Sequence, residues 1–308
     1  MDSSSLKGSY PLLIVGQHLT VALIALFVIG GATRVMEAGL ACPDWPLCYG
    51  AFFPGNKMNI QVFLEWFHRL DAFLVSVLIA VQFFISYRMR KQLPKWMPRI
   101  YFLMLLLVVF QAILGALTVY QLLKSEIVTA HLLTALTLII LVTGTNQKIK
   151  NPTNSVTPKW WKIMTFTSLF GLIVQSAIGG SLSTTWSSHI CLVNSDSCIL
   201  LDTHKTFAYF VSGLIFVFSL LAVSKGGKYL NQWPYLLSAL FLIFMQISLG
   251  ILTIYFELTI PIITIGHQLT AALLVSIIST LSCMNLKDKN NQSVMPSSNT
   301  NQKLELSL

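Results

Sequence analysis

Long apolar runs separated by short polar segments fill the chain from about residue 10 to residue 285. Each run is continuous rather than alternating, and each has the roughly 20 residues that a helix needs to cross the hydrocarbon core of a bilayer. Because lipid cannot satisfy unpaired backbone groups, such runs predict transmembrane helices and not strands. The eight predicted spans are Pro11–Gly31, Phe63–Tyr87, Ile100–Gln121, Ile127–Gln147, Trp161–Leu182, His204–Val223, Trp233–Tyr255 and Pro261–Met284.

Composition supports this pattern, since hydrophobic residues make up 55% of the 308 residues and charged residues only 10%. The mean hydropathy is +0.71. A soluble protein of this length cannot bury so much apolar surface in one core, which excludes a soluble enzyme, a disordered protein and a secreted disulfide scaffold. The net charge of +9 comes without the base-stacking groups of a nucleic-acid binder. The chain is predicted to be an all-α polytopic membrane protein that contacts the lipid bilayer and no nucleic acid.

The basic residues predict how the chain lies in the membrane. With the N-terminus inside, the inner segments hold 15 of the 20 Lys and Arg residues. Cytoplasmic loops carry such an excess of basic residues. Both termini are therefore predicted to be cytoplasmic, and the loops after the first and fifth spans are predicted to face outward. The polar segment 286–308 is expected to be a disordered cytoplasmic tail.

The chain contains an internal duplication. The string QAILGALTVY from Gln111 matches QISLGILTIY from Gln246, and HLLTAL from His131 matches HQLTAA from His267, at offsets of 135 and 136. An even number of spans per repeat gives both halves the same orientation. The fold predicted is two tandem four-helix bundles related by a pseudo-two-fold along the membrane normal. The predicted halves are residues 10–147 and 160–285.

Four of the six histidines lie near the outer ends of the even-numbered spans. They are His68, His131, His204 and His267. The separation is 63 residues within each half. A single histidine near the interface can be a hydrogen-bonded structural residue, but a duplicated pair can supply both axial ligands of a heme iron. Two nitrogen ligands per half suit zinc less well. The pattern predicts one heme in each half, near the outer face.

Three further residues are interpreted as structural. His18 in the first span has no duplicate, and His189 lies in the second outer loop. Cys283 is unpaired near the inner end of the last span and is expected to be a small buried residue.

One acidic residue distinguishes the halves. Glu65 precedes His68 by three residues, so both share a helix face, whereas the corresponding position before His204 is Leu201. A buried carboxylate beside a heme can accept a proton or stabilise a developing cation. The alternative is a carboxylate at the water interface, or one paired with Arg69. The asymmetry suggests that the first half performs chemistry and the second transfers electrons.

Each outer loop that follows a glycine pair contains two cysteines. Cys42 and Cys48 lie in CPDWPLC, and Cys191 and Cys198 lie in CLVNSDSC. Disulfides persist on the outer side of a membrane. Either a structural disulfide over a site or a redox-active pair fits, although the spacing differs from the C-x-x-C of thioredoxin-like motifs.

Together, the string ATRVMEAGLACPDWPLCYGAFFP, the following EWFHR and the duplicated histidines resemble the heme A synthase family, over about residues 10 to 285. The resemblance implies that Glu65 is the catalytic carboxylate. It implies that His68 and His131 bind the substrate heme O, and that His204 and His267 ligate a heme b cofactor. It also implies a disulfide within each cysteine pair.

The activity implied by the resemblance is that of a membrane oxidoreductase. It oxidises the C8 methyl group of heme O to a formyl group by successive hydroxylations, giving heme A for respiratory terminal oxidases. The implied location is the plasma (inner) membrane of a prokaryote. The implied partners are an electron acceptor and heme O synthase, the farnesyltransferase that makes the substrate. The residues alone also fit a bis-His di-heme electron carrier without catalysis and, less well, a transporter or a thiol oxidoreductase.

Overall fold

A computed structural model describes residues 9–150, 157–184, 198–225 and 232–286. Within these ranges the regular secondary structure is helical, and the closest approach to a strand is an isolated bridge between Cys48 and Ala51. The long helices are α2 (Tyr10–Val35), α3 (Ile60–Arg88), α4 (Trp96–Tyr120), α5 (Ser125–Lys150), α6 (Lys159–Thr184), α8 (Ile199–Ser224), α9 (Trp233–Tyr255) and α10 (Pro261–Ser282). A short 3-10 helix, η1 (Gly55–Lys57), lies in the loop between α2 and α3, which the sequence predicts to face outward.

The prediction of eight membrane-spanning helices is confirmed, because the described residues contain eight helices long and apolar enough to cross a bilayer. All the long helices before α9 begin earlier than the predicted spans, whereas α9 coincides with its span and α10 ends at Ser282 instead of Met284. The sixth span was predicted to begin at His204, whereas α8 begins at Ile199. The added turn contains Asp202, which lies 3.9 Å from the ammonium group of Lys205. Charged residues at helix ends lower local hydropathy without ending the helix, so the apolar pattern underestimates helix length.

The duplication extends to the backbone of the turns that follow α4 and α9. After α4, Leu122 and Leu123 have φ angles of 49° and 59°, and after α9, Glu257 and Leu258 have φ angles of 49° and 64°. In each turn, the N–H of the second residue donates to the carbonyl five residues earlier, at 2.8 and 3.0 Å. Left-handed backbone is unfavourable for residues with a side chain. Its recurrence at equivalent positions shows that the two segments adopt the same local structure.

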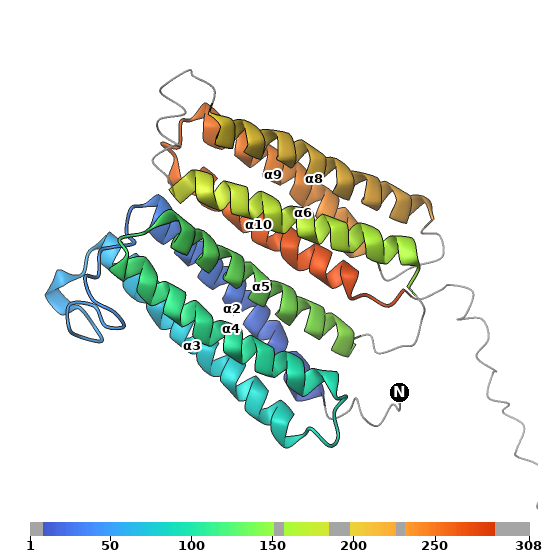
Figure 1. Cartoon of the computed structure of the whole chain (residues 1–308), viewed down its shortest axis with the longest axis horizontal. Coiled ribbons are helices and arrows are strands. Elements are labelled where there is room, and N and C mark those ends of the chain that lie inside the picture. Colours follow the sequence, from blue (N-terminus) through green and yellow to red (C-terminus); the bar gives the residue numbers. More distant parts are fainter. Residues whose placement is uncertain (1–8, 151–156, 185–197, 226–231, 287–308) are drawn as a thin grey trace, which may run out of the picture.

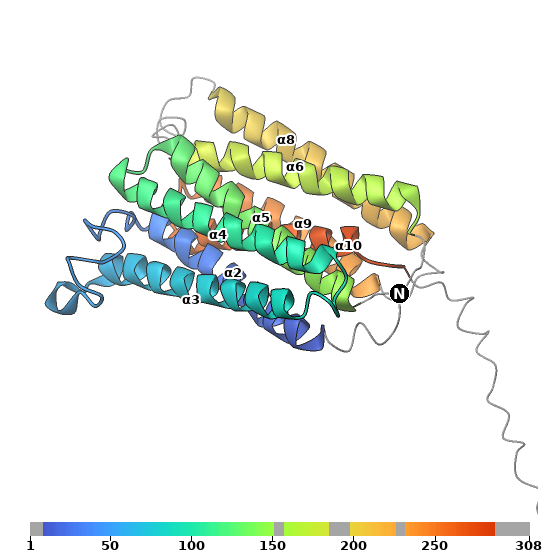
Figure 2. The ribbon, with the colours of Figure 1, turned by 60° about the horizontal axis from the view of Figure 1, so that its bottom comes forward.

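Helices of each half contact one another in a ring. In the first half α2 contacts α3, α3 contacts α4, α4 contacts α5, and α5 contacts α2. The same order of contacts joins α6, α8, α9 and α10. Contacts of α10 with α2 and α5, and of α5 with α6, join the halves, while α3 and α8 lie on opposite sides of the molecule (Figures 1 and 2). The symmetry axis that the duplication implies stays a prediction.

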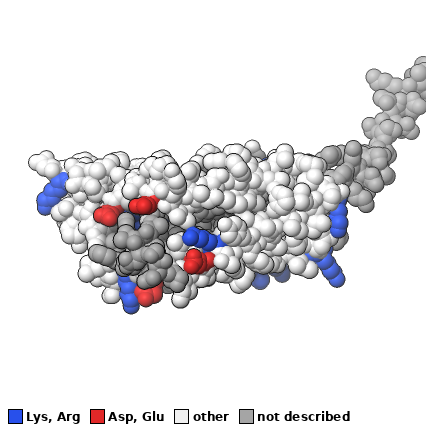
Figure 3. Space-filling model, turned by 90° about the horizontal axis from the view of Figure 1, so that it is seen from above, with Lys and Arg blue, Asp and Glu red and all other residues white. Residues whose placement is uncertain are grey.

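Most apolar side chains face outward. In the most apolar window of each helix, the buried share ranges from 17% in α9 to 39% in the centrally placed α5. Large residues such as Phe84, Phe170 and Phe244 are more than half exposed. A space-filling view shows a broad stretch without charged residues between those at the two ends (Figure 3). Apolar surface of this extent indicates contact with lipid rather than water.

Small residues line the boundary between the halves. Ser279 donates a hydrogen bond to the carbonyl of Ile140 at 2.8 Å. Cys283 is a free cysteine and only partly buried, and a Cβ placed on Gly144 would lie 3.0 Å from its sulfur. Small side chains let membrane helices approach closely and hydrogen-bond across their interface. Cys283 therefore acts as a small packing residue at the inner end.

Candidate active site

Each predicted histidine ligand lies against a glycine of the preceding helix. The pairs are Gly30 with His68, Gly115 with His131, Gly179 with His204, and Gly250 with His267. A Cβ added to these glycines would lie 2.8, 3.5, 2.8 and 3.1 Å, in that order, from the Cε1 atom of the imidazole. Every one of these glycines is five residues before the last residue of its helix. The four imidazoles therefore occupy equivalent cradles, and at three of them, all but that of Gly115, a Cβ would crowd the ring.

The cradle also brings the imidazole close to a backbone carbonyl. His267 Nδ1 lies 3.1 Å from the carbonyl oxygen of Gln246, four residues before the glycine. Gln246 Nε2 lies 3.2 Å from His267 Nε2. A neutral ring with its proton on Nδ1 satisfies both contacts, because Nδ1–H donates to the carbonyl and the Nε2 lone pair accepts from the Gln246 amide. Histidines that bind metals usually donate their other ring N–H to such an acceptor, which fixes the orientation of the ring.

In the first half, the two imidazoles face each other. The ring centroids of His68 and His131 are 6.5 Å apart, and their planes differ by 69°. Two imidazoles bound to opposite faces of one iron, with metal–nitrogen bonds of about 2 Å, would have ring centroids roughly 6 Å apart. The Nδ1 atoms of both rings are buried. The pair therefore has the spacing that two imidazoles on one heme iron require.

Three glutamines beside the histidines are functional residues that sequence reasoning missed. The contacts are Gln111 Nε2 to the carbonyl of His131 at 3.0 Å, Gln175 Nε2 to the carbonyl of His204 at 3.0 Å, and Gln246 Nε2 to His267 Nε2 at 3.2 Å. Each glutamine precedes the cradle glycine by four residues, within QAILG, QSAIG and QISLG. This repeated spacing was a visible signal. The fourth helix, α2, has Leu26 at that position.

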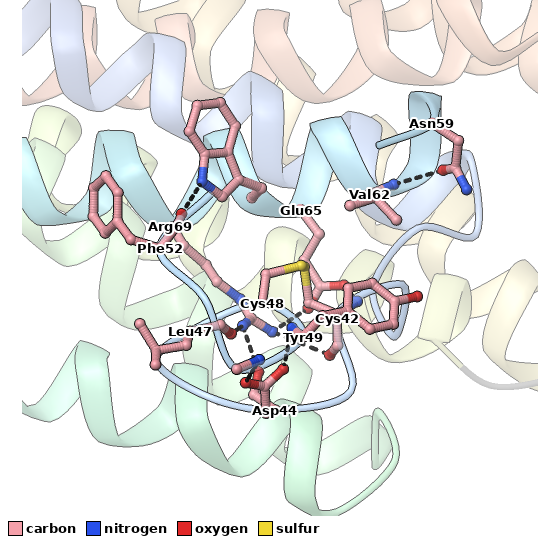
Figure 4. Close-up of a disulfide and its surroundings, with 12 residues drawn as sticks. Cys42, Asp44, Leu47, Cys48, Tyr49, Phe52, Asn59, Val62, Glu65 and Arg69 are labelled. Atoms are coloured by element: carbon pink, nitrogen blue, oxygen red, sulfur yellow. Dashed lines mark hydrogen bonds and ion pairs between the residues drawn. A yellow bond between two sulfur atoms is a disulfide. The ribbon is translucent and has the colours of Figure 1, made fainter. Parts of the chain in front are cut away.

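The carboxylate of Glu65 is buried, with an exposed fraction of 4%, and lies beneath the first outer loop (Figure 4). Its Oε2 accepts a hydrogen bond from the backbone N–H of Cys42 at 2.8 Å. Its Oε1 lies 2.5 Å from Arg69 Nη2. The ion pair with Arg69, one of the alternatives drawn from the sequence, is therefore present. The loop therefore holds one carboxylate oxygen of Glu65, and Arg69 holds the other.

Arg69 also holds the loop itself. Its guanidinium donates to the backbone carbonyls of Asp44 at 2.5 Å and Cys42 at 3.4 Å, and to that of Leu47. The planar fork of a guanidinium can satisfy several acceptors at once. Arg69 therefore links the catalytic candidate Glu65 to three points of the cysteine loop (Figure 4).

The predicted disulfide between Cys42 and Cys48 is confirmed, and both residues of the loop are buried. Cys198 immediately precedes α8. Cys191 and His189 lie outside the described residues, so the second disulfide stays a prediction.

Asp44 organises the turn inside the disulfide loop. Its carboxylate accepts hydrogen bonds from the backbone N–H groups of Tyr49 at 2.6 Å and Gly50 at 2.8 Å. The Gly50 hydrogen bond is the main reason that the pKa of Asp44 lies below its ordinary value. The charged form of Asp44 therefore stabilises the loop that covers Glu65.

The second glycine of each Gly-Gly pair faces the other half. A Cβ on Gly31 would lie 1.9 Å from Oε1 of Gln268, the residue after a ligand histidine. A Cβ on Gly180 would lie 3.4 Å from Thr129. The first glycine of each pair thus leaves room for the imidazole of its own half. The second leaves room for a side chain of the other half.

Two polar residues of α2 lie away from these cradles. The Nδ1 atom of His18 lies 2.8 Å from the carbonyl of Ile14 in its own helix, and the residue is exposed. This contact fits the structural role expected for His18. Arg34, near the outer end of α2, donates a hydrogen bond to the hydroxyl of Ser183 in α6 and so links the two halves.

Comparison with known proteins places this geometry in a family. A family model, COX15-CtaA, described as a cytochrome oxidase assembly protein, matches residues 16–279. The chain therefore belongs to the COX15-CtaA family of cytochrome oxidase assembly proteins.

Curated relatives extend the comparison. A protein named heme A synthase from Shewanella oneidensis is 29% identical over 199 residues, which cover 56% of this chain and 58% of that protein. A heme A synthase from Bacillus pumilus is 25% identical over 267 residues, covering 77% of this chain and 83% of that protein. The match thus spans less than two thirds of the Shewanella protein and most of the Bacillus protein.

Proposed function

We propose that the chain is a heme A synthase, which oxidises the C8 methyl group of heme O to a formyl group. The observation that carries the proposal is an asymmetry between repeated sites. Four histidines lie in equivalent glycine cradles, but only the first half adds a buried carboxylate, Glu65, three residues from a ligand. The names of the relatives from Shewanella oneidensis and Bacillus pumilus support the same activity.

In this proposal the two halves have different tasks. His68 and His131 bind the iron of the substrate heme O in the first half. His204 and His267 ligate a heme b cofactor in the second half, where bound heme b supplies one-electron transfer. The facing imidazoles of His68 and His131 support the first assignment. The glycine cradles, which recur in both halves, support both assignments.

Glu65 is the residue proposed to act on the methyl group. Conversion of a methyl group and one water molecule to a formyl group releases four electrons and four protons, so the site needs a base and an electron acceptor. Glu65 is the buried carboxylate available to accept a proton. The Cys42 N–H and Arg69 orient it, because each holds one carboxylate oxygen. The disulfide loop above excludes water from this network.

We further propose the plasma membrane of a prokaryote as the location, with both termini cytoplasmic and the heme sites toward the outer face. The excess of basic residues in the predicted inner segments and the bacterial relatives support this. Heme O synthase is a suitable partner because the farnesylated substrate is poorly soluble. The electron acceptor is a second partner.

The test is to purify the full chain from cells that make heme O and to analyse its pigments. We expect a reduced-minus-oxidised spectrum of low-spin heme, and extracted heme A together with heme b. Glu65→Gln should retain both hemes but yield heme O instead of heme A. Glu126→Gln is the matched control, because Glu126 is an exposed acid in the first turn of α5, near the same end of the molecule.

Two outcomes would overturn the proposal. Heme b alone, found while heme O is available, would favour a bis-His di-heme electron carrier without catalysis. Unchanged heme A production by Glu65→Gln would remove the role assigned to Glu65.

A further inference from the structure

We propose that His68 is the exchangeable axial ligand of the first-half heme, whereas glutamine side chains hold the other three histidines in place. The inference rests on the proposed function, because it concerns the exchange of heme O for its product. Gln111, Gln175 and Gln246 are positioning residues in this view, and Leu26 marks the site where such a residue is missing.

Gln111 and Gln175 donate to the backbone carbonyl of a histidine, and Gln246 donates to a ring nitrogen. Each extends from the helix that carries the cradle glycine to the histidine on the next helix, and thereby ties two neighbouring helices together. Gln175 Nε2 also lies 3.1 Å from His204 Nδ1. Gln246 is itself held by a hydrogen bond from the hydroxyl of Thr270. In the second half, both histidines therefore have a glutamine whose amide contacts the ring itself.

The first half differs on one side only. Gln111 bonds the backbone of His131, so the helix that carries this ligand is tied to α4. On the other side, the side chain of Leu26 packs against the apolar core and has no donor. The Nδ1 atom of His68 is buried beside the backbone of Leu26, as that of His131 is beside the backbone of Gln111. His68 therefore packs against Gly30 and the α2 backbone without the glutamine side-chain contact that the other three ligands have.

This difference matches what each heme must do. A permanently bound cofactor dissociates more slowly when both of its histidine ligands are held in a fixed position. A heme that enters as substrate and leaves as product has to break both iron–histidine bonds in every cycle. An interhelical hydrogen bond within a membrane contributes about 0.6 kcal/mol and at most about 1.7 kcal/mol, which corresponds to roughly a three- to twentyfold change in an equilibrium. One missing bond at His68 is enough to make this ligand the first to dissociate.

The experiment measures heme loss from the purified full chain in detergent. Excess apomyoglobin captures released heme, and chromatography of the remaining pigment separates heme O and heme A from heme b. In the unmodified protein, heme O and heme A should leave faster than heme b. Leu26→Gln should slow their loss about three- to twentyfold and leave heme b loss unchanged. Leu26→Met is the matched control, since it keeps an apolar side chain of similar size.

Gln175→Leu tests the same idea in the other half and does not depend on folding of the Leu26 variant. It should speed the loss of heme b by a similar factor while leaving heme O loss unchanged. Equal loss rates for the two hemes in the unmodified protein would overturn the proposal, as would a Leu26→Gln protein that releases heme O at the unmodified rate. These results differ from failure of the proposed function, in which no heme O or heme A would be present.

Discussion

Replacement of the cradle glycines by alanine tests how closely the imidazoles must approach the neighbouring helix. At Gly30, the added Cβ would lie 2.8 Å from Cε1 of His68, whereas at Gly115 it would lie 3.5 Å from Cε1 of His131. Real Cβ contacts are seldom shorter than the second value, so the first requires His68 or α3 to move by more than half an ångström. At Gly213 in α8, a Cβ would meet no atom within 4 Å.

The expected magnitudes follow from two opposing effects. Alanine stabilises a helix interior by about 1 kcal/mol relative to glycine. Overpacking of a close contact costs about 1–3 kcal/mol. Gly30→Ala should therefore destabilise the heme-binding position of His68 by up to about 2 kcal/mol. This corresponds to a weakening of heme O binding of up to about thirtyfold. Gly115→Ala and Gly213→Ala should be neutral or stabilise the protein by up to about 1 kcal/mol.

The assay is a titration of the purified variants with heme O, followed by absorbance, with thermal unfolding measured on the same samples. Binding should weaken for Gly30→Ala, while the two control variants bind normally and melt at the same or a higher temperature. The reasoning fails if Gly115→Ala weakens binding as much as Gly30→Ala does, because the two positions differ mainly in their distance from the imidazole.

Three further changes probe the loop that covers the first site. Glu65→Ala should lower the free energy of unfolding by about 1–3 kcal/mol, because it leaves the buried Cys42 N–H without an acceptor; a conserved melting temperature would contradict this. Replacing Cys42 and Cys48 together by serine removes a cross-link across six residues of sequence, which should cost about 2 kcal/mol, measured by denaturant titration with the reduced unmodified protein for comparison. Asp44 has a lowered pKa, so its contribution to loop stability is complete above the ordinary Asp pKa of about 4 and lost as pH falls through the lower folded-state value. Reduction of the disulfide by a phosphine should accelerate over that acidic range in the unmodified protein, and Asp44→Asn should abolish the pH dependence.

The helical organisation could be predicted because membrane insertion imposes a simple rule on sequence. A span needs a continuous apolar run, and eight such runs became eight helices. Helix ends were harder to predict, since Asp202 belongs to the first turn of α8 although it is charged. The histidine positions could also be predicted, because duplication placed the same residue type at matching offsets in both halves.

The partners of these residues were beyond the reach of the sequence. Glu65 was expected to share a face with His68, and its carboxylate is bonded to Cys42, which is 23 residues distant in the chain. The glycines and glutamines of the cradles were visible as parts of a repeat, yet their contact with histidines depends on which helices are neighbours. Helix adjacency is decided by packing of the whole bundle.

By itself, the sequence determined the number of spans, their duplication and the residue types that can bind iron, because each of these follows from local composition or spacing. The tertiary structure alone decided that each imidazole lies over a glycine, that Arg69 joins Glu65 to the cysteine loop, and that Leu26 takes the place of a glutamine beside His68. Such contacts depend on distances of a few ångströms between side chains on different helices. Apolar periodicity specifies which residues are helical, but the close fit of small and large side chains at helix interfaces specifies which of them meet.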